Sequence, residues 1–155
     1  MKLAKFIIVF LILNFTALYL GSWLMNNGPQ TNWYIHLNKA PWTPPGWVFG
    51  VTWTVIMICF SIFMAFLYNL NANLKVLLLY MLQWLLNIVW NFIFFNQHNI
   101  GLGLTTITLL TVIIMIFFFA FRKEMKFKSL LILPYLIWLC LATSLNAYIF
   151  LNNQG

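Results

Sequence analysis

The chain has 155 residues, of which 64% are hydrophobic and 6% are charged, and its formal net charge is +7. Soluble domains hold roughly 45–50% apolar and about 25% charged residues, so this composition excludes an ordinary soluble globule. The mean hydropathy of +0.94 extends over the whole chain, which is too small to bury so much apolar surface in one core. The basic residues lie in short polar gaps, which favours a membrane topology over nucleic-acid binding.

Five apolar stretches have the length of about 20 residues that a bilayer-spanning helix needs. We expect these spans near residues 6–24, 46–68, 74–95, 101–121 and 130–151. The sequence thus predicts an all-α fold: an integral membrane bundle of five transmembrane helices that forms a single domain over residues 1–155. The breaks between the later spans are short, so consecutive helices are expected to be antiparallel neighbours. A β-barrel is disfavoured because the runs do not alternate between apolar and polar residues.

The N-terminus precedes its apolar run with Lys2 and Lys5, an arrangement that also begins secretory signal peptides. The run is long and no clear small-x-small cleavage site follows it, so we expect a retained first helix, with cleavage as the alternative. The connection after this helix, residues 25–45, is long and rich in aromatic residues, unlike a turn. We expect it to act as a lid over one end of the bundle.

The basic residues are distributed unequally between the two ends of such a bundle. One end carries Lys2, Lys5, Lys75, Arg122, Lys123, Lys126 and Lys128, whereas the other carries only Lys39. By the positive-inside rule the N-terminus is cytoplasmic, and the long first loop and the C-terminus lie outside. We therefore expect a multi-pass protein of the cell membrane.

Few residues suggest catalysis or metal binding. Almost no ionisable group lies within a span, which argues against a proton relay or an ion pump. The single acid, Glu124, excludes catalysis by paired carboxylates. His36 and His98 are interpreted as solvated loop residues, and Cys59 and Cys140 as small hydrophobes. The sequence therefore predicts no metal site and no resident cofactor.

Neutral polar side chains recur at helical spacing in the third span. Gln83, Asn87 and Asn91 lie at i, i+4 and i+8 and share one helix face. An amide without a partner is costly in lipid, so this face is expected to point into the bundle. The stripe has two interpretations, which the spacing leaves open: hydrogen-bonding glue between helices, or one polar wall of a ligand cavity.

The last span repeats this spacing with Trp138, Ala142 and Asn146, one turn after Pro134, which we expect to loosen the helix. A large ring, a small residue and an amide on one stripe describe a pocket wall, although core packing gives the same pattern. Such pockets are mostly apolar with a few hydrogen-bonding groups. The stripes together suggest a flat apolar ligand with polar edges.

The second span opens with Pro44 and Pro45 and carries Gly46 and Gly50 ahead of Trp53. This G-x-x-x-G spacing permits close helix contact and leaves room beside the indole. The interfacial aromatic belt accounts for the tryptophans near the span end, Trp33, Trp42 and Trp47. The belt explains the deeper Trp53 and Trp138 less well.

Three segments carry a specific resemblance: WYIHLNKAPWTPPGWVFGVTW (33–53), LNIVWNFIFFNQHNIG (86–101) and LPYLIWLCLATSLN (133–146). They closely resemble the translocator protein family, TspO, also called the peripheral-type benzodiazepine receptor. The resemblance implies five transmembrane helices, frequently in a dimer, around a cavity that the first loop closes. It also implies binding of porphyrins such as protoporphyrin IX, as ligand or substrate, and of benzodiazepine-type drugs.

Carried over by position, the resemblance implies a ligand-binding pocket of Trp33, Tyr34, Trp42, Trp53, Asn87, Trp90, Trp138, Ala142 and Asn146. Bacterial members that the chain resembles are linked to light- and oxygen-dependent breakdown of protoporphyrin IX. Tryptophans that match Trp53 and Trp138 are implicated in it, which makes these two the catalytic candidates. An indole beside a photo-excited porphyrin can give up an electron, and a closed cavity shields reactive species from water.

Two departures from the family pattern limit this transfer. No basic residue follows Tyr148, although the animal proteins carry a cholesterol-associated motif of Tyr followed by Lys or Arg. In the loop, Lys39 is followed by Ala40 rather than directly by proline.

Three hypotheses remain open after these observations. The leading one is a membrane receptor or transporter that binds porphyrins and hydrophobic small molecules, as a homodimer in the lipid bilayer and without nucleic acid. The second is an enzyme that degrades protoporphyrin IX with light and oxygen. The third is an assembly partner whose amides serve only packing.

Overall fold

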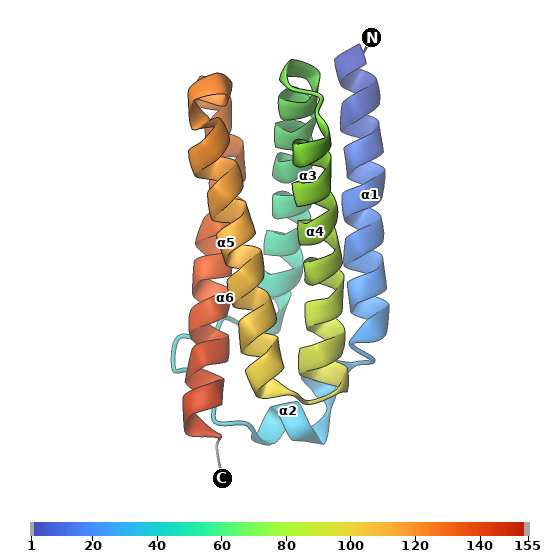
Figure 1. Ribbon diagram of the computed structural model, residues 1–155. Helices are drawn as coiled ribbons and strands as arrows, with labels where there is room; N and C mark the ends of the chain where they lie inside the picture. The colour runs from blue at the N-terminus through green and yellow to red at the C-terminus, as the bar shows by residue number, and fades with distance from the viewer. Residues whose placement is uncertain (1, 154–155) are drawn as a thin grey trace.

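The computed structural model describes residues 2–153, and this part of the chain is helical without strands (Figure 1). Its long helices are α1 (Lys2–Leu24), α3 (Gly46–Leu70), α4 (Leu74–Asn91), α5 (Ile100–Met125) and α6 (Leu133–Asn152). Short helical segments are η1 (Gly28–Gln30), α2 (Asn32–His36), η2 (Phe92–Asn96) and η3 (Lys126–Ile132). The expected all-α class is confirmed. The domain expected over residues 1–155 includes Met1, Gln154 and Gly155, which lie outside the described residues.

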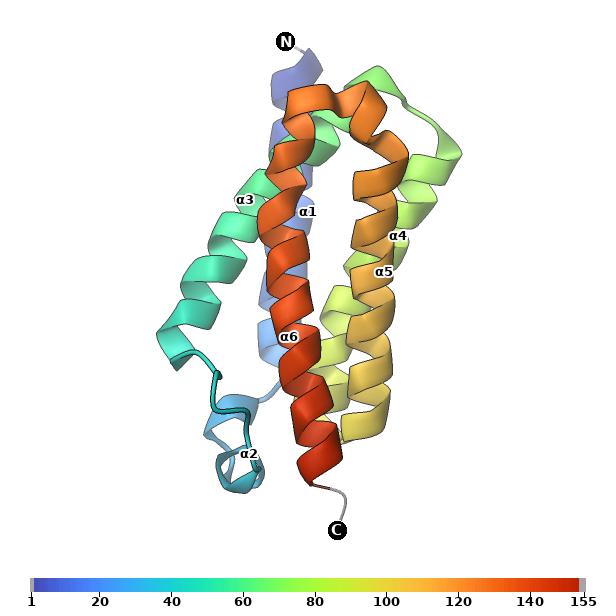
Figure 2. The same cartoon turned by 90° about the vertical axis from the view of Figure 1, so that its left-hand side faces the viewer.

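Four continuous helical stretches in the described residues are apolar and long enough to cross a membrane. The last of them, Ile100–Asn152, has 53 residues and contains both α5 and α6, which lie side by side and run in opposite directions (Figure 2). The fold is therefore a bundle of four to five apolar helices, compatible with a membrane.

The long helices form a ring in which α1 packs between α3 and α4. The ring continues from α4 to α5 and α6, and α6 returns to α3. The expectation that consecutive spans are neighbours is therefore wrong for α3 and α4. A buried amide in α1 explains the difference, because Asn14 finds partners on both of these helices.

Asn14 lies at the centre of a cluster that we call the Asn14 node, formed with Ser61 and Tyr80. The Asn14 Nδ2 atom donates to Ser61 Oγ at 2.8 Å, and the Tyr80 hydroxyl donates to Asn14 Oδ1 at 2.9 Å. All three side chains are buried. An uncompensated polar group is costly in an apolar medium, so these bonds favour one mutual arrangement of α1, α3 and α4.

The aromatic core adjoins this node. Phe60 of α3 is 1% exposed, and its ring centroid lies 5.2 Å from that of Tyr135 in α6 and 6.2 Å from that of Tyr80 in α4. It also packs edge-on against Phe117 of α5. Aromatic side chains of α4, α5 and α6 therefore all pack against the Phe60 ring of α3.

Helix α4 continues beyond Asn91 as a single π-helical turn, η2. Such turns contain one extra residue and are frequent at functional sites. Two glycines make room for the phenylalanines of this turn. A Cβ atom on Gly103 would lie 2.9 Å from the Phe94 ring, and one on Gly28 would overlap the Phe95 ring. A side chain at either position would therefore push the neighbouring phenylalanine ring out of place.

Three local expectations from the sequence are corrected. The polar break at residues 122–129 is helical, since α5 extends to Met125 and η3 packs on α3 and α5. Pro134 does not loosen the last helix, because it lies in the first turn of α6, where no backbone N–H is needed. Among the described residues no atom would lie within 4 Å of a Cβ on Gly46 or Gly50, so this pair makes no close helix contact within the chain.

The 25–45 segment lies at the end of the bundle where α1 ends and α3 begins, and it carries η1 and α2 (Figure 1). Thr31 caps α2, with its Oγ1 accepting from the Tyr34 amide at 3.4 Å. The described C-terminal end of α6 lies at the same end of the molecule. The 25–45 segment therefore lies beside the end of α6, the helix that carries the stripe of Trp138, Ala142 and Asn146.

Candidate functional site

A small cavity of about 30 Å³ lies where the 25–45 segment meets η2 and α6. Its lining is aromatic and aliphatic, and four of its side chains carry a polar group. It consists of Tyr34, Thr43, Phe49, Trp90, Phe94, Phe95, Ala142, Leu145, Asn146 and Ile149. Four of the nine sequence candidates line it: Tyr34, Trp90, Ala142 and Asn146. The remaining lining residues were not singled out by the sequence, and Phe94 and Phe95 reach the cavity through the π-helical turn.

Trp90 and Asn146 form the polar contact of the cavity. The Trp90 indole N–H donates to Asn146 Oδ1 at 3.4 Å, and Asn146 Nδ2 donates to the Ala142 carbonyl at 3.0 Å. The second bond holds the amide flat against α6, so that its oxygen faces α4. At 3.4 Å this contact is longer than the usual N–H···O distance of about 2.7–3.2 Å and therefore weak, so another partner can readily replace it.

Three further candidates lie one layer behind the cavity. The Trp138 ring packs edge-on against the cavity residue Phe49 at 5.2 Å, and Trp53 packs against Tyr135 at 5.8 Å. Asn87 Nδ2 contacts the Tyr135 hydroxyl at 3.2 Å. The structure therefore separates Trp53, Asn87 and Trp138 from the residues that line the cavity.

Tyr135 connects this layer, and sequence reasoning missed it. Its hydroxyl accepts from Asn87 and donates to Gln83 Oε1 at 3.2 Å, so two amides of α4 bond to one side chain of α6. Tyr135 lies three residues before Trp138, and extending that helix stripe by one turn would have found it. Gln83 and Asn87 are buried and thus face the bundle interior as expected. Their bonds to Tyr135 match the interpretation as hydrogen-bonding glue.

The aromatic candidates of the 25–45 segment lie outside the cavity lining, with the exception of Tyr34. Trp33 stacks on His98, with ring centroids 4.2 Å apart and planes within 16°, and it packs edge-on against Phe94. Trp42 is 52% exposed, and its indole N–H donates to Ser144 Oγ at 3.2 Å. Both rings fix the segment to the bundle.

The second half of the segment is fastened to the end of α6 by three hydrogen bonds, which we call the Asn clasp. The Asn38 amide N–H donates to Asn153 Oδ1 at 2.9 Å, and Asn153 Nδ2 donates back to the Asn38 carbonyl at 3.2 Å. Asn38 Nδ2 donates to the Asn152 carbonyl at 3.1 Å. These bonds are exposed, where water competes with them.

The charged group nearest to this end of the cavity is Lys39. Its Nζ atom lies 4.7 Å from the centroid of the Tyr34 ring and donates to the Tyr34 carbonyl at 3.2 Å. Burial raises the pKa of the Tyr34 phenol above its ordinary value of 10.0, so this group is neutral at physiological pH. The described residues contain no cluster of His, Cys, Asp and Glu that could hold a metal ion.

These features define a class: a helical membrane protein with an aromatic cavity beneath a fastened loop. The sequence pattern of the TspO/MBR family matches residues 7–151, and the chain belongs to this family. It is 33% identical to the "Tryptophan-rich protein TspO" of Chlorobaculum tepidum, over 76% of this chain and 77% of that protein. It is 32% identical to the protein of that name from Archaeoglobus fulgidus, over 99% and 97%, and 28% identical to the human "Translocator protein", over 83% and 79%.

Proposed function

We propose that this chain is a membrane receptor or transporter that binds porphyrins such as protoporphyrin IX, and benzodiazepine-type ligands, in tetrapyrrole homeostasis or a stress response. The observation that carries the proposal is the aromatic cavity with the Trp90–Asn146 pair. A flat apolar ring system stacks on aromatic side chains, while the indole N–H and the amide bond its polar edges. Family membership supports the same ligand class.

Binding a macrocycle requires the cavity to open. Small-molecule pockets have volumes of about 300–1,000 Å³, so the cavity of about 30 Å³ has to grow at least tenfold. The proposal requires the Phe94 and Phe95 rings and the 25–45 segment to move. We therefore propose that this segment is a lid and that the Asn clasp and the Trp33–His98 stack keep it closed.

The membrane arrangement belongs to the same proposal. All five long helices cross the bilayer, with the N-terminus in the cytoplasm and the lid and the C-terminal end outside. The support is the charge distribution, since seven of the eight basic residues lie at the end opposite the lid. From the resemblance to the family we also propose that two copies of the chain form a homodimer. Cysteine accessibility at positions 38 and 127 in intact cells tests this orientation.

The first experiment is a titration of the detergent-purified protein with protoporphyrin IX in the dark, followed by tryptophan quenching. We expect saturable binding that weakens about tenfold in Asn146→Ala, because the polar edge of the ligand loses its partner. The matched control is Asn91→Ala, which removes a half-buried amide of α4 outside the cavity lining. Absence of saturable binding in the folded wild type would reject the proposal and favour the role of an assembly partner.

The second candidate function is light- and oxygen-dependent degradation of protoporphyrin IX. It is supported by Trp138, which is 7% exposed and packs against the cavity residue Phe49. The indole would supply an electron to the photo-excited porphyrin, which passes it to oxygen to give superoxide. The indole radical cation would then recover an electron from the porphyrin, so that in net terms oxygen oxidises the porphyrin by one electron. Illumination of the bound complex should then convert the pigment in wild type but not in Trp53→Phe or Trp138→Phe, while dark binding persists. Equal bleaching in wild type, variants and empty detergent would leave a binding protein.

A further inference from the structure

Lys39 of the 25–45 segment is held in place by the last turn of α2. Its Nζ atom donates to the Tyr34 carbonyl at 3.2 Å and to the Ile35 carbonyl at 3.4 Å. The same atom lies 4.7 Å from the centroid of the Tyr34 ring. Lysine side chains often cap the carbonyls at the end of a helix, so these bonds alone are compatible with a structural role. An ammonium group has three N–H donors, however, and the carbonyls take two of them.

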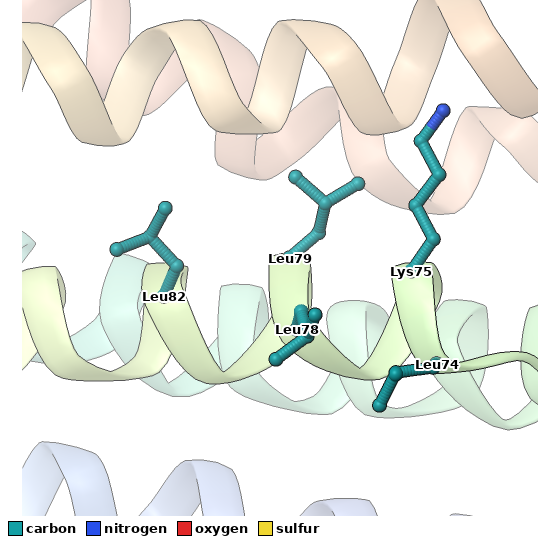
Figure 3. A pocket seen from close by; sticks show the side chains of 5 residues that line it. All are labelled: Leu74, Lys75, Leu78, Leu79 and Leu82. Carbon is teal, nitrogen blue, oxygen red and sulfur yellow. The ribbon is translucent and has the colours of Figure 1, made fainter.

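No acidic side chain of the described residues neutralises this ammonium group. The chain has a single acid, Glu124, which lies at the opposite end of the bundle and accepts from Asn71 Nδ2 at 3.3 Å. The other seven basic residues also lie at that end. Figure 3 shows one of them, Lys75, projecting from α4 beside leucine side chains. Lys39 is therefore the one lysine or arginine at the lid end, and its carbonyl partners compensate its charge only as dipoles.

This cation lies beside the wall of the cavity. Tyr34, whose ring it contacts, lines the cavity together with Trp90 and Asn146. Lys39 is half-buried, and the preceding residue, Asn38, is bonded to the end of α6 by the Asn clasp. The backbone on one side and the α2 carbonyls on the other thus position the ammonium group. Salt screens a partly buried charge less than an exposed one, so this position favours an anionic group on a ligand.

We propose that Lys39 determines the specificity of the cavity for tetrapyrroles with a free carboxylate, and that its ammonium group donates to one carboxylate oxygen of the ligand. The inference rests on the proposed function and adds the charge of the ligand to it. Protoporphyrin IX is a flat apolar macrocycle with carboxylate side chains on one edge. The macrocycle lies against the aromatic lining, and the carboxylate edge faces the lid. A charge-assisted hydrogen bond is about twice as strong as a neutral one, so it discriminates where apolar contacts do not.

The test compares protoporphyrin IX with its dimethyl ester, which keeps the macrocycle and removes the carboxylate charges. Dark titration of the detergent-purified protein, followed by tryptophan quenching, gives both affinities for each variant. In Lys39→Gln the affinity for the diacid should fall about fivefold, whereas the affinity for the ester should change less than about twofold. Glutamine keeps an N–H donor for the α2 carbonyls, so this variant isolates the charge. Lys39→Arg keeps the charge and should keep the preference for the diacid.

The matched control is Lys128→Gln. Its ammonium also lies over an aromatic ring, 4.1 Å from the centroid of Phe66, but at the opposite end of the bundle, so both affinities should stay within about twofold. Equal losses of diacid affinity in Lys39→Gln and Lys128→Gln would indicate general charge attraction and overturn the inference.

The ester separates this inference from the function on which it rests. Equal losses for the diacid and the ester in Lys39→Gln would leave Lys39 as a cap of α2 and overturn the inference. Unchanged affinities for both ligands in Lys39→Gln would also overturn it, while porphyrin binding itself would stand. If the folded wild type bound neither ligand, the proposed function would fail, and the role of Lys39 with it.

Discussion

The Asn14 node and the cavity beneath the lid are built from the same chemistry, amides beside aromatic rings, but they differ in how tightly they are bonded. In the node, Asn14, Ser61 and Tyr80 are at most 1% exposed, and the two bonds between them measure 2.8 and 2.9 Å. At the cavity, the Trp90–Asn146 bond measures 3.4 Å and Trp90 is half-buried. Short bonds in a closed site stabilise one arrangement, whereas long bonds beside a small cavity leave side chains free to exchange partners. The node holds the helices together, and the cavity is the part that would open under the proposed function.

The largest expected contrast is between two phenylalanines. Phe60→Ala removes a ring packed among four helices and should lower the free energy of unfolding by about 3–5 kcal/mol. Phe95→Ala removes a half-buried ring from the cavity lining and should cost about 1 kcal/mol. It should also speed porphyrin association, because the cavity becomes larger. Thermal unfolding in detergent and stopped-flow quenching measure the two effects. Similar stability losses would show that the cavity end is packed as tightly as the core.

Two asparagines give the next contrast. Asn14→Leu leaves the buried Tyr80 hydroxyl without its acceptor, whereas Ser61 Oγ still donates to the Met57 carbonyl. The variant should destabilise the fold by about 1–3 kcal/mol. The affinity of the remaining folded protein for protoporphyrin IX should not change. Asn146→Leu should instead weaken binding about tenfold, with a stability change below about 1 kcal/mol. If both variants lost stability and neither lost affinity, the second amide would be a packing residue like the first.

The Asn clasp offers a smaller effect with a matched control. Asn153→Ala removes the two side-chain bonds to Asn38, whereas Asn152→Ala keeps the clasp, since Asn152 contributes its backbone carbonyl. Exposed hydrogen bonds contribute at the low end of about 0.5–1.5 kcal/mol each, so lid opening in Asn153→Ala should rise about fivefold. The association rate of protoporphyrin IX measures this opening. Equal rates in the two variants would show that the clasp does not limit entry.

The sequence predicted the helices well, because a run of about 20 apolar residues leaves few alternatives in a membrane. The second span was expected to begin at residue 46, and α3 begins at Gly46. The buried stripes were also predictable, since amides avoid lipid and spacing fixes the face they share. Five of the six stripe residues are buried, namely Gln83, Asn87, Trp138, Ala142 and Asn146, and Asn91 is half-buried.

The arrangement of those faces in space was not predictable from spacing. The position of α1 between α3 and α4 depends on the partners of Asn14, which lie 47 and 66 residues away in the chain. The π-helical turn that brings Phe94 and Phe95 to the cavity leaves no periodic signal in the sequence. The spacing of residues along one helix also shows which side chains share a face, but not how far that face lies from the helix opposite. Trp53 and Trp138, which the resemblance places in the pocket, pack against Tyr135 and Phe49 one layer behind the cavity lining, and spacing carries no information on that depth.

The smallest expected effect concerns pH and the lid. Burial raises the pKa of the Tyr34 phenol above 10.0, which means that the closed lid favours the protonated form. Below pH 10 this contribution to closure is complete, and it decreases as the pH rises through the higher pKa of the closed state. Porphyrin association should therefore be independent of pH between 7 and about 9 and faster above about pH 10, by less than the effect of Asn153→Ala. Tyr34→Phe keeps the ring that packs on Phe95 and removes the proton, so its rate should stay flat across this range. A rise that persists in Tyr34→Phe would place the titrating group elsewhere and leave the Tyr34 ring as a packing contact of the lid.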